Sequence, residues 1–374
     1  MKTFQHQFKV LSNSIAKPDF DPDIVLIFGS RFQFEGDAIE LIQKTFSNST
    51  LFGCSTSGEI SNHGVSDNSI VYTCIKFENE NSSFKYKNCK VEKPEDSFHA
   101  GSQLSKGLYR DNLKHILILS DGQSVNGSEL VKGISENLPE SVTVTGGLAG
   151  DGDRFEQTYV IDENGYPKSG IVSAIGLYGD HFQIAYGSAG GWTPFGIERK
   201  VTRSEGNILY EIDGSPALEL YKYYLGDNVK NLPSSALLFP INMRVNANSE
   251  GVVRTILNVN EKDNSLIFAG DIPNNSLVQL MKSNSHRLID GAEQAANITL
   301  EQSNEIPELA FFVSCIGRKL VMKQLTDEEV EIASDKLSNP TITGFYSYGE
   351  IAPFKTGKVC ELHNQTMTIT TIKE

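Results

Sequence analysis

A glycine-rich segment at residues 53–60, reading GCSTSGEI, is the first stretch whose residue types could carry chemistry. Its glycines permit tight curvature and close approach of a ligand to the backbone. Its hydroxyls and backbone N–H groups can hold a carboxylate or another anion. The alternative is a structural turn whose hydroxyls cap nearby backbone groups, and the GK[ST] ending of a P-loop is absent. The candidate ligand-binding residues of this segment are Gly53, Cys54, Ser55, Thr56, Ser57 and Glu59.

Two further glycine-containing segments follow apolar runs that read as strands. One begins at 121, directly after HILILS, and the other is GGLAGDG at 146–152. Because α/β proteins place ligand groups at the carboxyl ends of strands, we expect the loops at 53–59, 121–126 and 146–151 to converge on one pocket. The alternative for the second loop is a helix N-cap turn. The candidate residues here are Asp121, Gly122, Gly146, Gly147 and Ala149.

Charged residues among the candidates suggest how a ligand could be held. Arg318 is the candidate clamp for a ligand carboxylate, because its planar guanidinium binds two oxygens at once. Glu59 and Asp121 can pair with a ligand amine, since a desolvated charge must find a partner. The alternative for Arg318 is a structural salt bridge to Glu350 or another acid.

The C-terminal part adds Glu350, His363 and Asn364 as candidates. Glu350 and His363 could form an acid–base or ligand-binding pair. The alternative is a core hairpin in which both side chains are hydrogen-bonded. The run Asp151–Asp153 lacks the twelve-residue loop of an EF-hand, so a calcium site is not expected.

A thiol hydrolase or transferase is a separate hypothesis, with Cys54 as nucleophile and His63 or His363 as base. No feature of the sequence pairs these residues, and HExxH, GxSxG and GxGxxG are all absent. We therefore expect a ligand-binding protein and not an enzyme.

The elements that position these residues read as alternating strands and helices, which predicts a mixed α/β fold of layered sheets with antiparallel hairpins. The strands at 70–77 and 84–91 are expected to be antiparallel neighbours, and those at 171–178 and 182–186 to form a hairpin. A long helix is predicted over 276–297 and a strand over 236–239, with Thr326 and Glu329 forming a capping box for a later helix. No repeat with a period of 20–50 residues is found. Other strands are predicted at 23–28, 50–54, 115–120, 142–144, 252–257, 266–268, 310–315, 341–347 and 366–372, and other helices at 37–46, 95–109, 130–138 and 218–225.

Length and composition bound the class of protein. The chain has 374 residues, which suits two lobes, and we expect domains at 1–195 and 196–374 that pack directly on each other. The net charge of -14 argues against binding to nucleic acid or to anionic membranes. The five Cys show no CxxC spacing, and no signal peptide or apolar run of membrane-spanning length is present, so a cytoplasmic location is expected.

In their order along the chain, these motifs resemble the FIST family. The N-terminal pattern is carried by GCSTSGEI at 53–60, by the strand with DG and NG at 116–127, and by GGLAGDG at 146–152. The C-terminal pattern is carried by EIDGSPALELYKYYLG at 211–226, SLVQLM at 276–281, SCIGR at 314–318, GFYSYGEIAP at 344–353 and LHNQTMT at 362–368. Each motif alone is weak, but together and in this order they are specific and cover nearly the whole chain.

The resemblance implies a prokaryotic sensory protein that binds a small ligand, with an amino acid or similar metabolite as the expected class. It implies a separate signalling partner, such as a histidine kinase or a cyclic-dinucleotide enzyme. Some family members are described as haem proteins that respond to nitric oxide, which makes a non-covalent haem sensor the alternative. No CxxCH motif is present, so covalent haem is excluded, and His63 or His363 would be the candidate axial ligand. No metal or other cofactor is expected.

Overall fold

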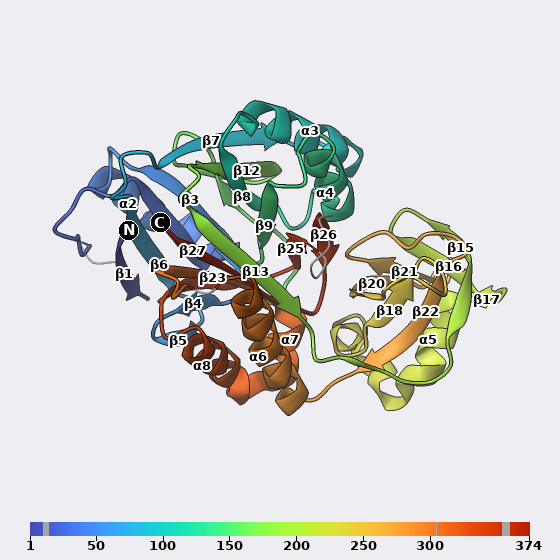
Figure 1. Ribbon diagram of the computed structural model, residues 1–374. Helices are drawn as coiled ribbons and strands as arrows, with labels where there is room; N and C mark the ends of the chain where they lie inside the picture. The colour runs from blue at the N-terminus through green and yellow to red at the C-terminus, as the bar shows by residue number, and fades with distance from the viewer. Residues whose placement is uncertain (10–14, 304, 354–359) are drawn as a thin grey trace.

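The chain folds into a large body and a smaller one. The computed structural model describes residues 1–9, 15–303, 305–353 and 360–374. The large body contains the chain up to β13 (Gln183–Ala189) and again from α6 (Ser285–Gln302) onward. The residues in between form the small body, which two chain segments connect to the rest (Figure 1).

Three six-stranded sheets make up the large body within the described residues. In their order across the first sheet, the strands are β1 (Lys2–Phe8), β6 (Ile70–Lys76), β2 (Ile24–Ser30), β3 (Thr50–Thr56), β10 (Val160–Ile161) and β11 (Pro167–Lys168). The second sheet has β7 (Ser83–Lys90), β12 (Ile171–Tyr178), β8 (Leu113–Ser120), β9 (Thr143–Leu148), β25 (Gly349–Pro353) and β26 (Cys360–His363). The third sheet has β13, β27 (Met367–Lys373), β23 (Leu309–Cys315), β24 (Thr341–Ser347), β4 (Glu59–Ser61) and β5 (Gly64–Ser66).

These sheets arise from one structural unit that occurs three times: β1–β6, β7–β12, and β13 with β23–β27. Each unit has a parallel pair, β2 with β3, β8 with β9, or β23 with β24. A later strand of the unit, β6, β12 or β27, returns antiparallel to the first strand of that pair. A short hairpin leaves the unit and joins a neighbouring sheet, pairing β4 with β24, β10 with β3, and β25 with β9. Every sheet therefore contains strands from two units.

A glycine in the second strand of each parallel pair shows how closely the units match. Gly53, Gly146 and Gly344 lie opposite Ile27, Ile118 and Phe312 on the neighbouring strand. A Cβ atom at these glycines would lie 1.9, 1.8 and 1.9 Å from the carbonyl oxygen of that neighbour. Only glycine fits there, which explains a glycine in the middle of each buried strand.

The three sheets face one another across a central core, and helices cover their outer faces. Phe28, Leu119 and Val313 from the three first strands lie in the central cluster, where Phe28 stacks on Phe345 with ring centres 5.0 Å apart. Burial on both faces explains why these strands read as continuous apolar runs. The covering helices are α1 (Arg31–Glu35) and α2 (Ala38–Thr45), α3 (Ser97–Leu108) and α4 (Gly127–Ser135), and α6 with α8 (Thr326–Lys336).

The small body has its own apolar core around the buried side chains Leu218, Tyr221 and Leu225 of α5 (Ala217–Leu225). Its strands belong to one sheet of nine within the described residues. Those strands are β14 (Thr193–Pro194), β15 (Arg199–Glu205), β16 (Ile208–Ile212), β17 (Ser215–Pro216), β18 (Ile241–Arg244), β19 (Val252–Arg254), β20 (Ile256–Asn260), β21 (Ser265–Phe268) and β22 (Leu277–Lys282). The described residues also form the 3₁₀ helices η1 (Pro94–Asp96), η2 (Gly226–Asn231), η3 (Ser234–Leu238) and η4 (Lys323–Leu325).

The mixed α/β class is confirmed, but both predicted hairpins are wrong. The strands β6 and β7 do not pair, because β6 lies in the first sheet and β7 in the second. Likewise β12 lies in the second sheet and β13 in the third. At both places the chain completes one unit and starts the next, so the turn leads away from the strand that precedes it.

Three local predictions also differ from the structure. The expected helix at 276–297 is a strand, β22, followed by α6, which begins after the N-cap Asn284. The expected strand at 236–239 lies largely within the 3₁₀ helix η3. The capping box does not form, because the Thr326 hydroxyl donates to the Lys323 carbonyl and Glu329 is engaged by Arg318.

The predicted domain limits, 1–195 and 196–374, do not coincide with the two bodies. The third sheet combines β4, β5 and β13 from before residue 195 with β23, β24 and β27 from after it. The small body is in effect an insertion within the third unit, between β13 and β23. No helix among the described residues has the length and apolar character needed to span a membrane.

Candidate functional site

The carboxyl ends of the three parallel pairs meet at one place, where backbone hydrogen bonds join each unit to the others. Gly150 N donates to Ser55 O at 2.9 Å, and Ser57 N donates to Tyr346 O at 2.8 Å. Tyr348 N closes the ring by donating to Leu148 O at 3.2 Å. The loops at 53–59 and 146–151 thus lie next to each other, and the segment after β24 joins them. The third loop of the prediction, at 121–126, contributes no residue to the cleft described below.

Serine side chains strengthen this junction. Ser55 Oγ donates to Gly150 O at 2.8 Å. Ser57 Oγ lies 3.1 Å from Gly152 O and 3.2 Å from Gly152 N, so it bonds both ends of that residue. These bonds match the structural alternative for the hydroxyls, although Ser57 also lines the adjoining cleft.

A polar cleft of about 510 Å³ opens beside the junction. This volume falls within the usual size range of small-molecule sites. Side chains and backbone from all three units line it, including α7 (Ile316–Met322), the helix that follows β23. The lining residues are Ser30, Thr56, Ser57, Gly58, Glu59, Asp67, Asn68, Gly152, Asp153, Arg154, Ile316, Lys319, Leu320 and Lys323.

Glu59 is the buried acid of the cleft, with its side chain fixed by three hydrogen bonds. Its Oε1 accepts from Thr56 Oγ1 at 2.6 Å, and its Oε2 accepts from Ser69 Oγ at 2.6 Å and Ser69 N at 3.1 Å. Burial raises the pKa of Glu59 to about 7, because desolvation outweighs these hydrogen bonds and the nearby charge of Lys319. Glu59 therefore changes charge near neutral pH.

Lys319 is the basic residue that spans the cleft from α7 to the first unit. Its Nζ donates to Ser57 O at 2.9 Å and to the carboxylate of Asp67. The same ammonium lies 5.3 Å from the ring centre of Tyr346. One side chain thus ties α7 to the loop after β3.

Among the predicted residues of the first segment, Thr56, Ser57 and Glu59 line the cleft, and Gly53 and Cys54 do not. Gly53 lies inside β3, and the Cys54 side chain is fully buried in the central core. Burial raises the pKa of the Cys54 thiol well above its usual value. No hydrogen bond joins Cys54 to a histidine in the described part of the chain.

The predicted residues of the second and third segments do not line the cleft and have structural roles. Asp121 Oδ1 accepts from Gln123 N at 2.8 Å and Ser124 N at 2.7 Å, and its Oδ2 accepts from Gly170 N at 3.0 Å. Asp121 therefore closes a turn, and the helix N-cap considered as the alternative for this loop is Asn126, which accepts from Glu129 N at 3.2 Å. Other predicted residues also serve packing: Gly122 contacts the Ala149 carbonyl, Gly146 and Gly147 lie within β9, and Ala149 N bonds Ser120 O.

Arg318 does not face the cleft but forms the structural salt bridge considered as its alternative. Its side chain is fully buried, and its Nη2 lies 2.7 Å from Oε2 of Glu329. The same guanidinium donates to the carbonyls of Gly190 and Leu288. The partner acid is Glu329 and not Glu350.

Glu350 and His363 lie opposite each other on β25 and β26, but each has its own partners. Glu350 accepts from Ser347 Oγ at 2.6 Å and from Thr366 Oγ1 at 2.9 Å, and burial raises its pKa to about 7. His363 Nε2 is 3.1 Å from Ala352 O, and burial lowers the pKa of the imidazole to about 4. Asn364 accepts from Thr255 N at 3.4 Å and so contacts the small body.

Glu350 is the third unit's counterpart of Glu59. Each glutamate stands third after a parallel strand, and each accepts from a hydroxyl at the end of that strand and from the residue before the returning strand. Only Glu59 lines the cleft. The motif GEI thus marks two equivalent structural positions, of which one adjoins the candidate site.

Several residues that line the cleft were not predicted from the sequence, namely Ser30, Asp67, Asn68, Arg154, Ile316, Lys319, Leu320 and Lys323. Two of them had a usable signal. Lys319 directly follows the SCIGR motif, and Arg154 follows GGLAGDGD. Asp67 and Asn68 had none, since they precede an ordinary strand.

The residues available for a metal ion or a haem group can be compared with what each group requires. The described residues hold no group of three or more His, Cys, Asp or Glu suited to a metal ion. A non-covalent haem needs an axial ligand in an apolar pocket. No His, Cys or Tyr lines the polar cleft, so its residues do not fit haem.

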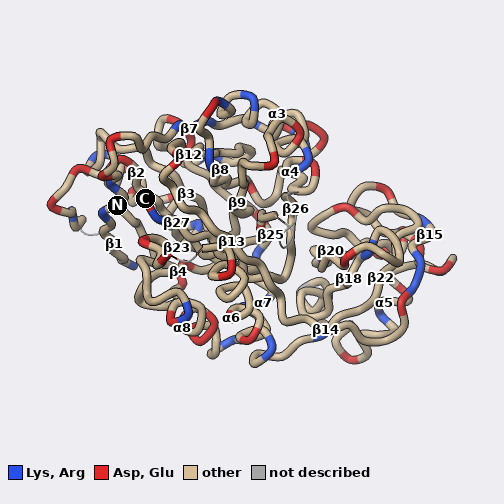
Figure 2. Tube along the Cα trace, viewed as in Figure 1, with Lys and Arg blue, Asp and Glu red and all other residues tan. Residues whose placement is uncertain are grey.

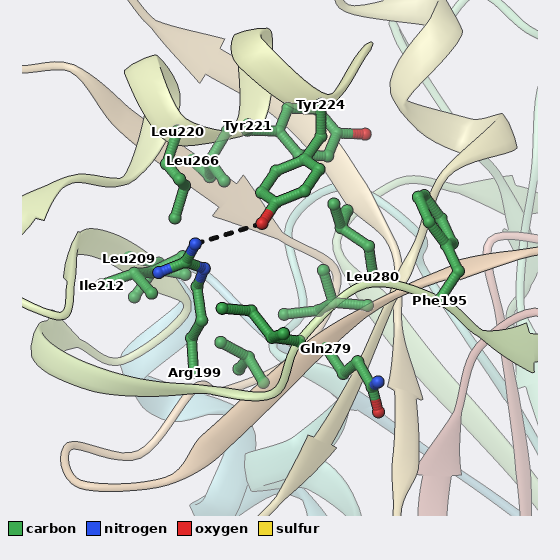
Figure 3. A pocket seen from close by; sticks show the side chains of 13 residues that line it. Phe195, Arg199, Leu209, Ile212, Leu220, Tyr221, Tyr224, Leu266, Gln279 and Leu280 are labelled. Atoms are coloured by element: carbon green, nitrogen blue, oxygen red, sulfur yellow. Dashed lines mark hydrogen bonds between the residues drawn. The ribbon is translucent and has the colours of Figure 1, made fainter.

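A second hollow lies in the small body and is almost entirely apolar (Figure 3). Phe195, Leu220 and Leu280 line it, and Arg199 at its edge donates to the Tyr224 hydroxyl at 3.1 Å. Its volume of about 30 Å³ is that of a single water molecule. The larger polar cleft is therefore the candidate ligand site.

Comparison with known proteins covers most of the chain. The FIST N domain matches residues 23–215, and the FIST C domain matches residues 217–353. An uncharacterized protein of Mycobacterium tuberculosis is 24% identical over 355 residues, which cover 89% of this chain and 87% of that protein. An uncharacterized protein of Methanocaldococcus jannaschii is 26% identical over 209 residues, or 50% of this chain, and this match spans only 38% of that longer protein. The two domain matches meet beyond the predicted limit at 195/196, inside the small body.

Proposed function

The chain belongs to the FIST family, whose domains are sensory, and we propose that it is a sensor that binds a small ligand in the polar cleft. The ligand class is an amino acid or a similar metabolite. The signal passes to a separate protein, such as a histidine kinase or a cyclic-dinucleotide enzyme. The five unpaired cysteines support a cytoplasmic location for this sensor.

The observation that carries this proposal is the meeting of all three units at one polar cleft. Groups of both signs line it: Lys319, Lys323 and Arg154 are basic, and Glu59 and Asp67 are acidic. A zwitterionic metabolite needs both signs in its site. A ligand here would contact loops from every unit at once and could thereby alter how the units pack.

A route from the cleft to the small body supports a signalling role. Lys319 lines the cleft, and its neighbour Arg318 holds the carbonyls of Gly190 and Leu288. Gly190 lies just before the chain enters the small body, and Leu288 lies just after the chain returns. A ligand that shifts α7 would alter the hydrogen bonds from Arg318 to the two segments that connect the bodies. The ligand would thereby change the relative populations of two positions of the small body.

A thermal-shift screen tests the proposal. Amino acids and related metabolites are added to the purified chain, and a ligand at a hundredfold excess over its Kd stabilises the fold by about 2.7 kcal/mol. The variant L320W narrows the cleft by placing a larger side chain on α7 and should lose the shift. The matched variant E331W, on the exposed face of α8, should keep it.

Two outcomes would contradict the proposal. If no compound of any charge shifts the midpoint, or if L320W responds like the parent chain, the cleft is not a ligand site. An absorption spectrum taken first tests the haem alternative, because a Soret band in the purified protein would favour a haem sensor over this one.

A further inference from the structure

The cleft is more basic than the protein that surrounds it. The whole chain carries a net charge of -14, and acidic residues are scattered over both bodies (Figure 2). In the cleft, by contrast, basic Arg154, Lys319 and Lys323 face acidic Glu59, Asp67 and Asp153. Glu59 has its pKa raised to about 7 by burial, so it is only partly ionised at neutral pH. The cleft is therefore neutral to positive and does not repel an anion as the remaining surface does.

Two of the three cations have no counter-ion within the part of the chain that the structure describes. Lys319 is paired with Asp67. No carboxylate among the described residues lies within ion-pair distance of Arg154 or Lys323. The Arg154 guanidinium lies 5.0 Å from the centre of the Phe32 ring, which holds it without neutralising it. Both side chains line the cleft and are exposed, so their charges are available to a ligand.

The buried hydroxyl of one cleft-lining residue also lacks a partner. Ser30 is only 5% exposed, and its Oγ makes no hydrogen bond within the described residues. The same residue lines the cleft at the end of β2. A serine hydroxyl can donate a hydrogen bond to an oxyanion. In folded proteins most buried polar atoms have a hydrogen-bond partner, so one without a partner needs an explanation. Ser30 therefore supplies an unpartnered donor next to the cleft.

We propose that the cleft recognises a small oxyanion, a carboxylate or phosphate group, between Arg154, Lys323 and Ser30. The inference rests on the proposed sensory function and names the chemical class of its ligand. Arg154 supplies a planar fork that can bond two oxygens of one group, and Lys323 supplies a point charge. The cleft is less suited to a cation, since Asp67 is paired and Glu59 already accepts three hydrogen bonds. Among the described residues, Asp153 is then the one cleft carboxylate without an ion pair or side-chain hydrogen bond, against two such cations.

Calorimetric titration at fixed ionic strength in a phosphate-free buffer tests this assignment. The probes are succinate, citrate and inorganic phosphate, with succinamide as the uncharged match for succinate. We expect at least one oxyanion to bind and succinamide not to bind. R154Q and K323Q should each weaken the binding at least tenfold, R154K should restore part of it, and S30A should weaken it by a smaller factor.

Matched controls are R203Q and K262Q, which remove a charge from the small body and should leave the affinity unchanged. The assignment is overturned if succinamide binds as well as succinate, or if R154Q and K323Q bind the oxyanions like the parent chain. It is also overturned if no oxyanion binds while neutral or cationic metabolites give an L320W-sensitive thermal shift, in which case the sensor proposal stands. Phosphate binding without carboxylate binding, or the reverse, identifies the source of the oxyanion.

Discussion

Arg318 and Glu329 form a fully buried ion pair, with Nη2 and Oε2 2.7 Å apart and both side chains 0% exposed. Glu329 also accepts from Ser314 Oγ at 2.9 Å and from the Tyr346 hydroxyl. The pair therefore links α7, α8, β23 and β24 in the third unit. Through the carbonyls of Gly190 and Leu288, it also holds both connections to the small body.

We expect R318M to destabilise the chain by about 3–5 kcal/mol, because it leaves a buried carboxylate without its partner. The double variant R318M/E329Q should recover at least half of this loss, since glutamine removes the charge and still accepts from Ser314. Urea unfolding measures both. As a control, K373M breaks the exposed pair with Glu305 and should cost less than about 1 kcal/mol. A loss in R318M no larger than in K373M would show that the ion pair does not hold the third unit together.

The threefold repeat predicts that three distant glycines respond alike. G53A, G146A and G344A each place a Cβ against a carbonyl oxygen of the paired strand, so each should cost roughly 1–3 kcal/mol or more by overpacking. G107A is the matched control, because a Cβ at this α3 position would meet nothing nearer than 3.7 Å. It should be neutral or stabilise by about 0.5–1 kcal/mol, since alanine favours helix. Thermal unfolding measures all four, and a neutral result at any of the three glycines would contradict their equivalence.

Local patterns predicted individual elements of this fold well, but not how they are assembled. The apolar runs at 115–120 and 310–315 correspond to β8 and β23, because burial on both faces leaves a plain sequence signal. The sequence carries no such signal for which strands pair with each other, since the turns after β6 and β12 resemble ordinary hairpin turns. The repeat was also hidden by distance. The clearest signs of the repeat are the motif Thr-x-x-Gly, which ends at Gly53, Gly146 and Gly344, and the motif GEI, which follows two of these strands. The copies of each motif are separated by much more than 20–50 residues.

The raised pKa values of Glu59 and Glu350 predict that the free energy of unfolding falls as pH rises towards neutral. Burial raises the pKa of each from about 4.5 to about 7, so between these values the folded chain binds more protons than the unfolded chain. Their contribution to stability is present below pH 4.5 and is lost as pH rises to 7. Relative to E59Q or E350Q, the parent chain should lose up to about 1.4 kcal/mol per pH unit over this range. Urea unfolding at pH 5, 6, 7 and 8 measures the difference.

The exposed acid Glu331 supplies the control for that experiment, because E331Q should leave the pH profile unchanged. Parallel profiles for the parent chain, E59Q and E350Q would contradict the raised pKa values. Glu59 should differ from Glu350 in one respect. Since only Glu59 lines the cleft, only E59Q should alter the pH dependence of oxyanion binding.

The candidate site was predicted in part, for a physical reason. Glycine and hydroxyl residues at strand ends leave a local pattern, so Thr56, Ser57 and Glu59 could be found from the sequence. The charge of a side chain can also be read from the sequence, but the direction in which the side chain points cannot. Arg318 points into the third unit and Lys319 into the cleft, although they are consecutive residues of one short helix. That distinction depends on Glu329, 11 residues after Arg318, and on Ser57, 262 residues before Lys319.

Thiol labelling tests whether Cys54 has any chemical role. Its thiol is fully buried with a raised pKa, whereas Cys89 is only partly buried on β7. Because the thiolate is the reactive form, we expect Ellman's reagent at pH 7.5 to label Cys89 first and Cys54 only after unfolding. The variant C89S should lose the labelling seen in the folded parent chain. Urea should expose the remaining thiols in the parent chain and in C89S. Rapid labelling of folded C89S that a further C54S substitution abolishes would contradict the buried, unreactive thiol and would favour a Cys54-dependent enzyme.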